Sequence, residues 1–538
     1  MFFGHPNLLA YAALFLFIPV TLALYARLSA TKATIVAMLA GVLFLPEVLA
    51  IDPPLLPPMD KTSITAAWAL VGCLWKARRQ LVRARPLRGI DGLFVLLLLC
   101  NVGTALTNPD PLVTGPIVRP GLVLYDAVAL GIKDTLAIYL PFLLGRAMVT
   151  QRRDLHTLLS ALLSFGLVYA CLALVEIRLS PQLHNWLYGY HQMDFSMAIR
   201  FGGYRPMIFM QTGLAVGMFM LAVTLAAIAL RRTGNARART VVFLAVVLVL
   251  CKSTGAILYA LVVLPVAAFV RRPRARLPAA LALLTLLYPL LRTTDTFPTD
   301  TLVEQAERIN EERALSLWFR FDQEFQLLQR ALERPYFGWG GYNRNRHFDP
   351  ETGEDLSVTD GDWTIQIGTR GLVGFVALYG LLTVPVLLTW RRLRRIRSRD
   401  DRLRLCTLAL ITALWVVDLL PNGLFHCLPF FFAGALYGLL HGIADTSARQ
   451  EGPAGPPRRR RTEAEVTGVQ ELEALEDVSY GQREAMRIEV AQRRVGLSRA
   501  REALRHLRIG LACLRVDRLR VARARLCEQL ALGVRRAA

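Results

Sequence analysis

Six charged side chains lie next to apolar stretches of this sequence, and their types suit one kind of chemistry. They are Arg200, Arg205, Lys252, Arg320, Asp360 and Asp362. Arginine offers several N–H donors in a fixed fork and stays ionised, so two or three such cations at a membrane surface can hold a diphosphate. A nearby carboxylate can accept the proton of an attacking hydroxyl. Charges beside a membrane span are costly and therefore indicate function, although a single loop charge is more often only solvated.

The eight cysteines of the chain follow no metal-binding pattern. Neither a CxxC pair nor a Cys/His spacing typical of zinc occurs, so the sequence predicts neither structural zinc nor a disulfide framework. The net charge of +22 is compatible with nucleic-acid binding, yet in an apolar chain short basic loops more simply mark the cytoplasmic side of a membrane. We therefore expect no metal, no cofactor and no nucleic-acid partner.

Membrane helices are the elements that must position the six charges. Of the 538 residues 54% are hydrophobic, and the mean hydropathy of +0.39 is too high for an ordinary soluble domain. Runs of roughly 20 apolar residues cross about 30 Å of hydrocarbon, where backbone groups must bond internally. We predict an all-α, polytopic integral membrane helical bundle with about 12 to 13 spans. The predicted spans cover residues 7–28, 33–50, 63–77, 91–107, 126–148, 155–178, 206–230, 240–252, 254–271, 277–292, 363–390, 403–420 and 425–444.

Basic clusters predict the orientation of these spans, because short cytoplasmic loops are rich in Lys and Arg. The clusters lie at residues 76–79, 152–153, 231–232, 271–276 and 391–404. They share one side only if residues 240–271 form a short hairpin that turns at Lys252. The predicted parts are an N-terminal membrane bundle (1–292), a large periplasmic loop (293–362), C-terminal membrane helices (363–446) and a cytoplasmic basic helical tail (447–538).

Two helices are predicted outside the membrane. The first begins near Thr301, ends at Pro335 and carries an apolar stripe that should pack on the membrane domain or on lipid. The stripe consists of Trp318, Phe321, Phe325 and Leu328. In the tail, leucines repeat every seventh residue between arginines, which predicts self-association or docking on anionic lipid. These are Leu497, Leu504 and Leu511.

Four short motifs follow one another in the central part of the chain. They are Arg200-Phe201-Gly202-Gly203, Lys252-Ser253-Thr254-Gly255-Ala256, Arg320 with Pro335 and Gly338-Trp339-Gly340, and Asp360 with the glycines up to Gly374. In type and order they resemble motifs of the O-antigen ligase and polymerase superfamily of bacterial envelope enzymes. The chain departs from the ligases at Thr254, where they carry an arginine, and at Asp360, where they carry a histidine. An aspartate at this position fits a polymerase-like relative better, and His347 is out of register.

The resemblance implies a metal-independent, inverting glycosyltransferase of the bacterial inner membrane. Its donor would be a polyprenyl-diphosphate-linked oligosaccharide, used on the periplasmic face in exopolysaccharide or O-antigen biosynthesis. Arg200 and Arg320 would hold the diphosphate or position the loop, with Arg205 and Lys252 as auxiliary cations. Asp360 would be the catalytic base and Asp362 its substitute. Other polysaccharide-assembly proteins are expected partners.

Three other functions are compatible with the sequence. One is a ligase that transfers the glycan to a lipid, a protein or another surface acceptor. Another is a transporter or flippase for the same lipid-linked glycans, although related halves or matching broken helices are not visible in the sequence. The last is a membrane scaffold whose basic tail recruits partners.

Overall fold

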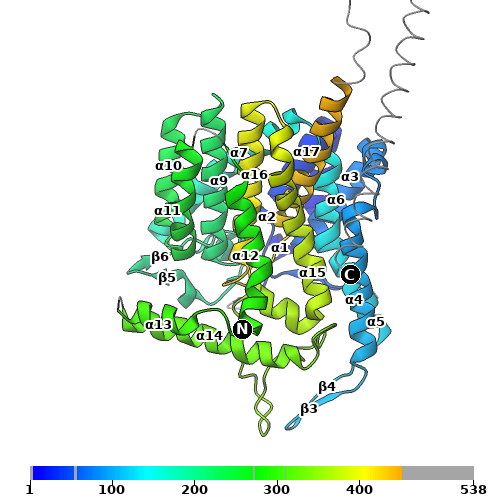
Figure 1. Ribbon diagram of the computed structural model, residues 1–538, viewed down its shortest axis with the longest axis vertical. Helices are drawn as coiled ribbons and strands as arrows, with labels where there is room; N and C mark the ends of the chain where they lie inside the picture. Colours follow the sequence, from blue (N-terminus) through cyan, green and yellow to red (C-terminus); the bar gives the residue numbers. More distant parts are fainter. Residues whose placement is uncertain (1–3, 54–56, 271–272, 309, 451–538) are drawn as a thin grey trace, which may run out of the picture. The chain divides into compact units, whose positions relative to one another are not determined.

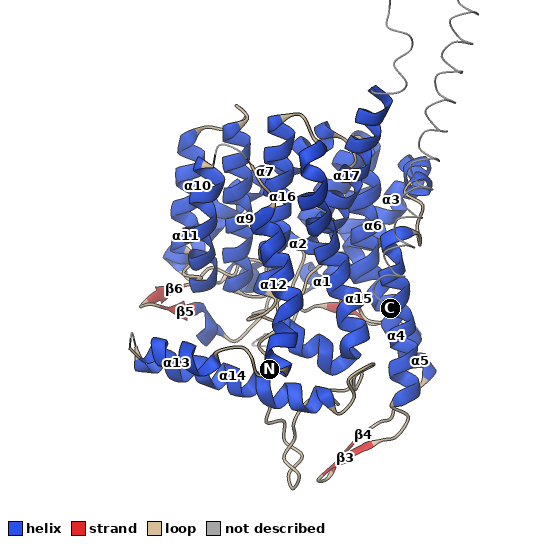
Figure 2. Cartoon of the chain, in the orientation of Figure 1, coloured by secondary structure: helices blue, strands red, loops and turns tan. Residues whose placement is uncertain are grey.

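The computed structural model describes residues 4–53, 57–270, 273–308 and 310–450, and the chain is mostly helical (Figures 1 and 2). Within these described ranges, six helical stretches are long and apolar enough to cross a membrane. They are Leu8–Arg27, Gly89–Thr107, Leu124–Met148, Arg152–Leu179, Gly213–Arg232 and Asp362–Arg395. Several such helices in one chain are the mark of a multi-pass membrane protein. The predicted tail beyond residue 450, with its leucine repeat, lies outside the described residues.

A helix overlaps each predicted span, with α5 and α6 forming one continuous stretch. The predicted span 33–50 is too long, because its helix ends at Phe44. The bundle helices are α1 (Leu8–Arg27), α2 (Ala30–Phe44), α3 (Lys61–Arg83), α4 (Gly92–Thr107), α5 (Leu124–Asp134), α6 (Leu140–Met148), α7 (Arg152–Leu179), α9 (Gly213–Arg232), α10 (Ala238–Leu250), α11 (Thr254–Phe269), α12 (Arg276–Thr293), α15 (Asp362–Arg392), α16 (Arg399–Asp418) and α17 (Leu428–Gln450). A π-helical turn, Thr135–Tyr139, joins α5 to α6. The connections add α8 (Leu183–Tyr188), α13 (Thr299–Glu307) and α14 (Glu311–Leu332).

Three short antiparallel hairpins in the described part of the chain correct the all-α prediction. They pair β1 (Ala50–Ile51) with β2 (Met59–Asp60), β3 (Leu112–Thr114) with β4 (Ile117–Arg119), and β5 (Ile199–Arg200) with β6 (Gly203–Tyr204). All lie in connections between helices, where the chain reverses and its backbone groups pair across the turn. The bundle itself is helical, as predicted.

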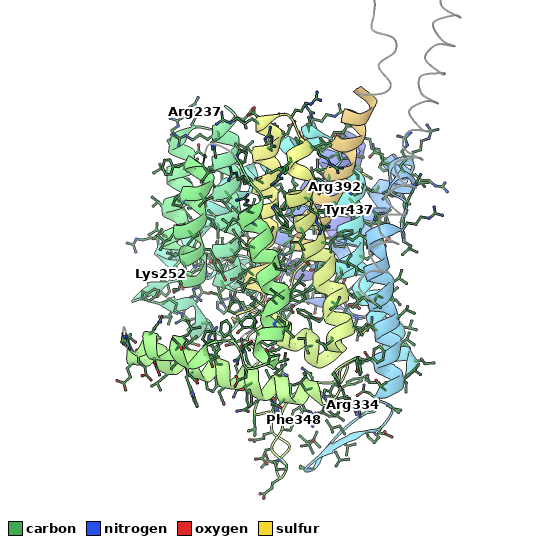
Figure 3. The ribbon with its side chains drawn as sticks, in the orientation of Figure 1. Arg237, Lys252, Arg334, Phe348, Arg392 and Tyr437 are labelled. Carbon is green, nitrogen blue, oxygen red and sulfur yellow. The ribbon has the colours of Figure 1, made fainter. Side chains whose placement is uncertain are left out.

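The helix ends form two faces. At one, which we call the basic face, Arg232 donates to the carbonyls of Ala267 (2.6 Å) and Val270 (2.7 Å), and Arg152 pairs with Asp401 (3.0 Å). At the other, the loop face, α13 and α14 lie across the ends of the bundle helices (Figure 1). Figure 3 shows Arg237 and Lys252 toward opposite ends of α10. The predicted basic clusters at residues 152–153 and 231–232 therefore lie at the same end of the bundle.

The segment before α9 corrects the predicted span of residues 206–230. The helix begins only at Gly213, and Met207 to Met210 are buried without being helical. Their backbone groups are satisfied by side chains, as irregular buried backbone requires. Glu176 accepts from the N–H groups of Met207 (2.7 Å) and Ile208 (2.8 Å), Gln192 donates to the carbonyls of Ile208 and Met210, and Lys61 donates to that of Phe209 (3.1 Å).

The predicted stripe of the loop helix is divided in the structure. Leu328 is buried, whereas Trp318 and Phe325 are half exposed. A different anchor holds α14 to the bundle: Glu324 accepts from the Tyr288 hydroxyl (2.9 Å) and pairs with Arg292 (3.4 Å). Burial raises the pKa of Glu324, while its bond to Tyr288 and the charge of Arg292 oppose that rise.

Candidate functional site

Three of the six predicted charges form a cationic cluster at the loop face, made of Arg200, Arg205 and Lys252. Lys252 occupies the turn between α10 and α11 in a left-handed conformation (φ 51°), and its Nζ donates to the Arg200 carbonyl (3.1 Å). Arg205 donates in turn to the Lys252 carbonyl (3.3 Å). These two bonds join the hairpin β5–β6, the residue that follows it and the α10–α11 turn, so the three cationic residues lie close together.

Glycines make room for this cluster. A Cβ on Gly203 would lie 2.4 Å from the Lys252 Nζ, and one on Gly213 would lie 2.1 Å from the Arg205 Cδ. A Cβ on Gly217 would lie 2.4 Å from that of Ser253, the residue after Lys252. Real Cβ atoms do not approach so closely, so α9 must present glycine to the Arg205 stem and to the α10–α11 turn.

Arg205 is a buried cation whose charge is not balanced. Its side chain is only 4% exposed, its Nε has no hydrogen-bond partner, and no carboxylate among the described residues forms an ion pair with it. Burial, assisted by the charge of Arg200, lowers the pKa of Arg205 to about 10. The guanidinium therefore stays ionised at neutral pH. A buried unpaired charge is costly, and an anionic ligand would remove the cost.

The other three predicted charges, Arg320, Asp360 and Asp362, do not belong to the cationic cluster. Arg320, on α14, pairs with Asp360 at 3.4 Å, and both side chains are about two-fifths exposed (42% and 40%). Asp362 does not reach the surface. It is 2% exposed and accepts hydrogen bonds from Tyr379 (2.9 Å) and Gln366 (3.0 Å) inside the bundle. Its position is that of a structural group at the start of α15.

Asp418, which the sequence analysis missed, lies between these two groups. It is 5% exposed, and a Cβ on Gly255 in the first turn of α11 would lie 3.9 Å from its Oδ1. The same segment reaches Asp360, because a Cβ on Gly423 would lie 3.3 Å from the Asp360 carbonyl. Asn422 donates to the Asp418 carboxylate (3.0 Å). A lone carboxylate at the end of the apolar run 403–420 was the signal that could have found it.

No model of a known protein family matches the chain, and no curated protein matches its sequence. The chemistry of the site therefore has to be argued from its own geometry. Among the residues that the structure describes, no group of three or more His, Cys, Asp or Glu side chains is placed to hold a metal ion.

A break in α15 frames the Arg320–Asp360 side of the site. At Gly371 the backbone takes φ 63° and ψ −171°, and a Cβ there would lie 2.3 Å from the Tyr336 carbonyl oxygen. The turn after Pro335 fills the break and bonds the freed backbone groups. The bonds run from Leu372 to Pro335 (2.7 Å), Val373 to Tyr336 (3.2 Å), Trp339 to Gly368 (2.8 Å) and Gly340 to Thr369 (2.9 Å). The Pro/Gly motif and the glycines of α15 thus form one joint.

A buried polar network, which includes Lys61, Glu47 and His184, holds the segment that follows Arg205. Lys61 pairs with Glu47 and also donates to the Phe209 carbonyl in the segment that follows Arg205. His184 accepts from the Glu47 N–H at Nε2 (3.1 Å) and donates from Nδ1 to the Tyr190 carbonyl (2.8 Å). These bonds require the neutral ring with its proton on Nδ1.

We expect this network to weaken in acid. Burial, assisted by the charge of Lys61, lowers the pKa of His184 from 6.5 to about 4, although the bond to Tyr190 opposes the shift. Because the unfolded chain binds the proton more tightly, this stabilisation is complete above about pH 6.5 and is lost as the pH falls toward about 4. The full loss is roughly 3 kcal/mol. Melting temperatures of the wild type and of His184→Gln should converge over this window, and parallel curves would contradict the prediction.

Proposed function

We propose that this chain is a multi-pass membrane glycosyltransferase that uses a polyprenyl-diphosphate-linked glycan as donor. The observation that carries the proposal is Arg205, a buried cation without a carboxylate partner, in contact with Lys252 and close to Arg200. A diphosphate supplies negative charge and several acceptor oxygens, which a fork of N–H donors matches. In the proposed orientation, the cluster would face the head group of a membrane lipid.

The same proposal assigns sides to the two faces. The basic face carries Arg152, Arg232 and Arg237, so we place it in the cytoplasm. The loop face, with α13 and α14, is then extracytoplasmic, and about 12 to 13 segments cross the membrane, some of them shorter than a full span. The membrane would be the bacterial inner membrane, in keeping with the resemblance to O-antigen ligases and polymerases.

In the proposed reaction, the acceptor hydroxyl attacks the anomeric carbon while the bond to the diphosphate breaks. The cations of the cluster stabilise the charge that develops on the leaving diphosphate. A carboxylate on the opposite side accepts the hydroxyl proton. Asp360, held by Arg320 at 3.4 Å, is the proposed base. Both Asp362 and Asp418 are buried, but Asp362 is bonded to Tyr379 and Gln366 inside the bundle, whereas Asp418 faces the first turn of α11. Asp418 therefore replaces Asp362 as the alternative base.

Polymerase and ligase share this chemistry and differ in the acceptor. The test uses purified protein in proteoliposomes with a polyprenyl-diphosphate-linked oligosaccharide, and it measures the product by gel and mass spectrometry. We expect longer lipid-linked chains from the wild type, and loss of product from Arg200→Ala, Arg320→Ala and Asp360→Asn. If Asp418→Asn abolishes product and Asp360→Asn does not, Asp418 takes the role of the base.

Two outcomes count against the proposal. Movement of intact donor across the bilayer without a new glycosidic bond would make the chain a transporter. Normal product from all four variants would remove the site from the reaction. Transfer that occurs only when a lipid or protein acceptor is added would leave the mechanism in place and identify a ligase.

A further inference from the structure

A cavity of about 220 Å³ opens between α4, α5 and the turn at residues 340–342. None of its lining residues belongs to the cationic cluster or to the Arg320–Asp360 pair. Its walls are mostly apolar, and small side chains such as Ala105 and Ala127 leave the space open. An apolar cavity of about 150 Å³ is large enough to hold a benzene-sized ligand. This one therefore has room for part of an alkyl chain.

Two polar residues of the cavity wall, Asn101 and Asp126, are already bonded to protein. Asn101 donates to Asp134 (2.8 Å), and Asp134 in turn binds Arg370 through two bonds (2.6 and 2.7 Å). Asp126 accepts from the Tyr342 hydroxyl (2.9 Å) and from the Val123 N–H (2.8 Å). These groups build the wall and leave little capacity for a ligand.

Lys133 is the exception among the polar groups of the wall. It lines the cavity, is exposed, and forms no hydrogen bond or ion pair with any residue that the structure describes. It lies on the stretch Leu124–Met148, which is long and apolar enough to cross a membrane. The π-helical turn Thr135–Tyr139 follows directly. Unpaired charges on such helices, and π-turns within them, both occur preferentially where ligands bind.

The turn that closes the cavity is strained. Tyr342 and Asn343 adopt left-handed backbone conformations (φ 58° and 56°), which residues other than glycine seldom take. Strain of this kind persists where the surrounding structure holds it, and it clusters at ligand clamps. Here the bond from Tyr342 to Asp126 fastens the turn to α5.

We propose that this cavity binds one chain of an anionic membrane lipid, with the acidic head group on Lys133. The apolar wall takes the alkyl chain, and the ammonium group supplies the charge that the head group needs. We favour a membrane lipid as the ligand because the cavity adjoins a helix of spanning length. A free phosphate is less favoured, because Lys133 is the one unpaired cation among the described residues that line the cavity. The inference does not depend on the proposed glycosyl transfer.

The test uses the full-length protein in nanodiscs that contain a phosphatidylglycerol with a photoreactive diazirine in one acyl chain. After irradiation, peptide mapping locates the label, and we expect it on α4 and α5 beside the cavity. Ala127→Trp fills the cavity and should remove the label. Lys133→Ala should reduce it about tenfold, the effect of one charge-assisted contact. Lys133→Arg should retain it, as should the matched control Arg239→Ala on α10.

Melting temperatures exclude variants that fail to fold, and Lys133→Ala, on an exposed site, keeps the test decisive if Ala127→Trp does not fold. Unchanged labelling in Lys133→Ala would overturn the head-group contact. Equal labelling by a photoreactive phosphatidylcholine would overturn the preference for an acidic lipid. Labels spread evenly over the bundle would overturn the site itself.

Discussion

Replacing Asp134 with Ala is expected to cost about 3 to 5 kcal/mol of folding free energy, because Arg370 would then be buried without a counter-charge. The two side chains form a bidentate pair with distances of 2.6 and 2.7 Å, and they are only 3% and 11% exposed. Asn101 contacts both partners. The loss should appear as a lower melting temperature and poorer recovery of folded protein in detergent.

A double variant separates the missing partner from the missing pair. Asp134→Leu combined with Arg370→Met replaces both charges with apolar groups, and we expect it to recover most of the stability lost by Asp134→Ala. Asp110→Ala, an exposed carboxylate in the loop between α4 and α5, is the matched control and should lie within about 0.5 kcal/mol of the wild type. A double variant as unstable as the single one would contradict the argument.

The Asp134–Arg370 pair also explains why the effect should extend to the loop. Arg370 immediately precedes the break at Gly371, where the turn from Pro335 to Gly340 is bonded to α15. If the guanidinium moves to find water, the backbone at the break moves with it. Limited proteolysis should therefore cut the 335–340 turn of Asp134→Ala faster than that of the wild type.

The helices were predictable because their signal is strong and local. Apolar runs bounded by arginines gave α10 and α11 as a short pair turning at Lys252, and the structure has that pair. The short hairpins gave no such signal. Each strand has two or three residues, too few for the alternation of polar and apolar side chains that identifies a strand. The number of true membrane crossings remains a prediction, since six helical stretches of the described residues are long and apolar enough to cross and the others are shorter or more polar.

The candidate site was predictable by residue type and less so by position. Arg200, Arg205 and Lys252 do come together, but the segment that follows Arg205, predicted as the start of a membrane helix, is not helical before Gly213. Hydropathy cannot reveal that Glu176 and Lys61 bond its backbone, since these partners come from distant helices. Asp418 is the opposite case. Its charge is visible in the sequence, but only the fold shows which residues lie next to it.

Replacing Arg205 with Met should weaken binding of a polyprenyl diphosphate strongly and leave the protein at least as stable as the wild type. These two results together separate a ligand-binding residue from a structural one. Arg205 is buried without a carboxylate partner, so an apolar side chain of similar length removes a cost of folding. Loss of one buried charged contact weakens binding by about 2 to 5 kcal/mol, which is about 30-fold or more.

Binding of a fluorescent polyprenyl diphosphate to protein in nanodiscs measures the effect, with inorganic pyrophosphate as competitor. Gly213→Ala is a second route to the same result. Its Cβ would lie 2.1 Å from the Arg205 Cδ, so it should displace an intact guanidinium and also weaken binding. Arg237→Ala removes an exposed arginine at the end of α10 opposite to Lys252 (Figure 3), and this variant should bind as the wild type does. If Arg205→Met binds normally, the buried cation has another purpose. If instead Arg205→Met unfolds, Arg205 is a structural residue, and Arg200 and Lys252 alone must bind the diphosphate.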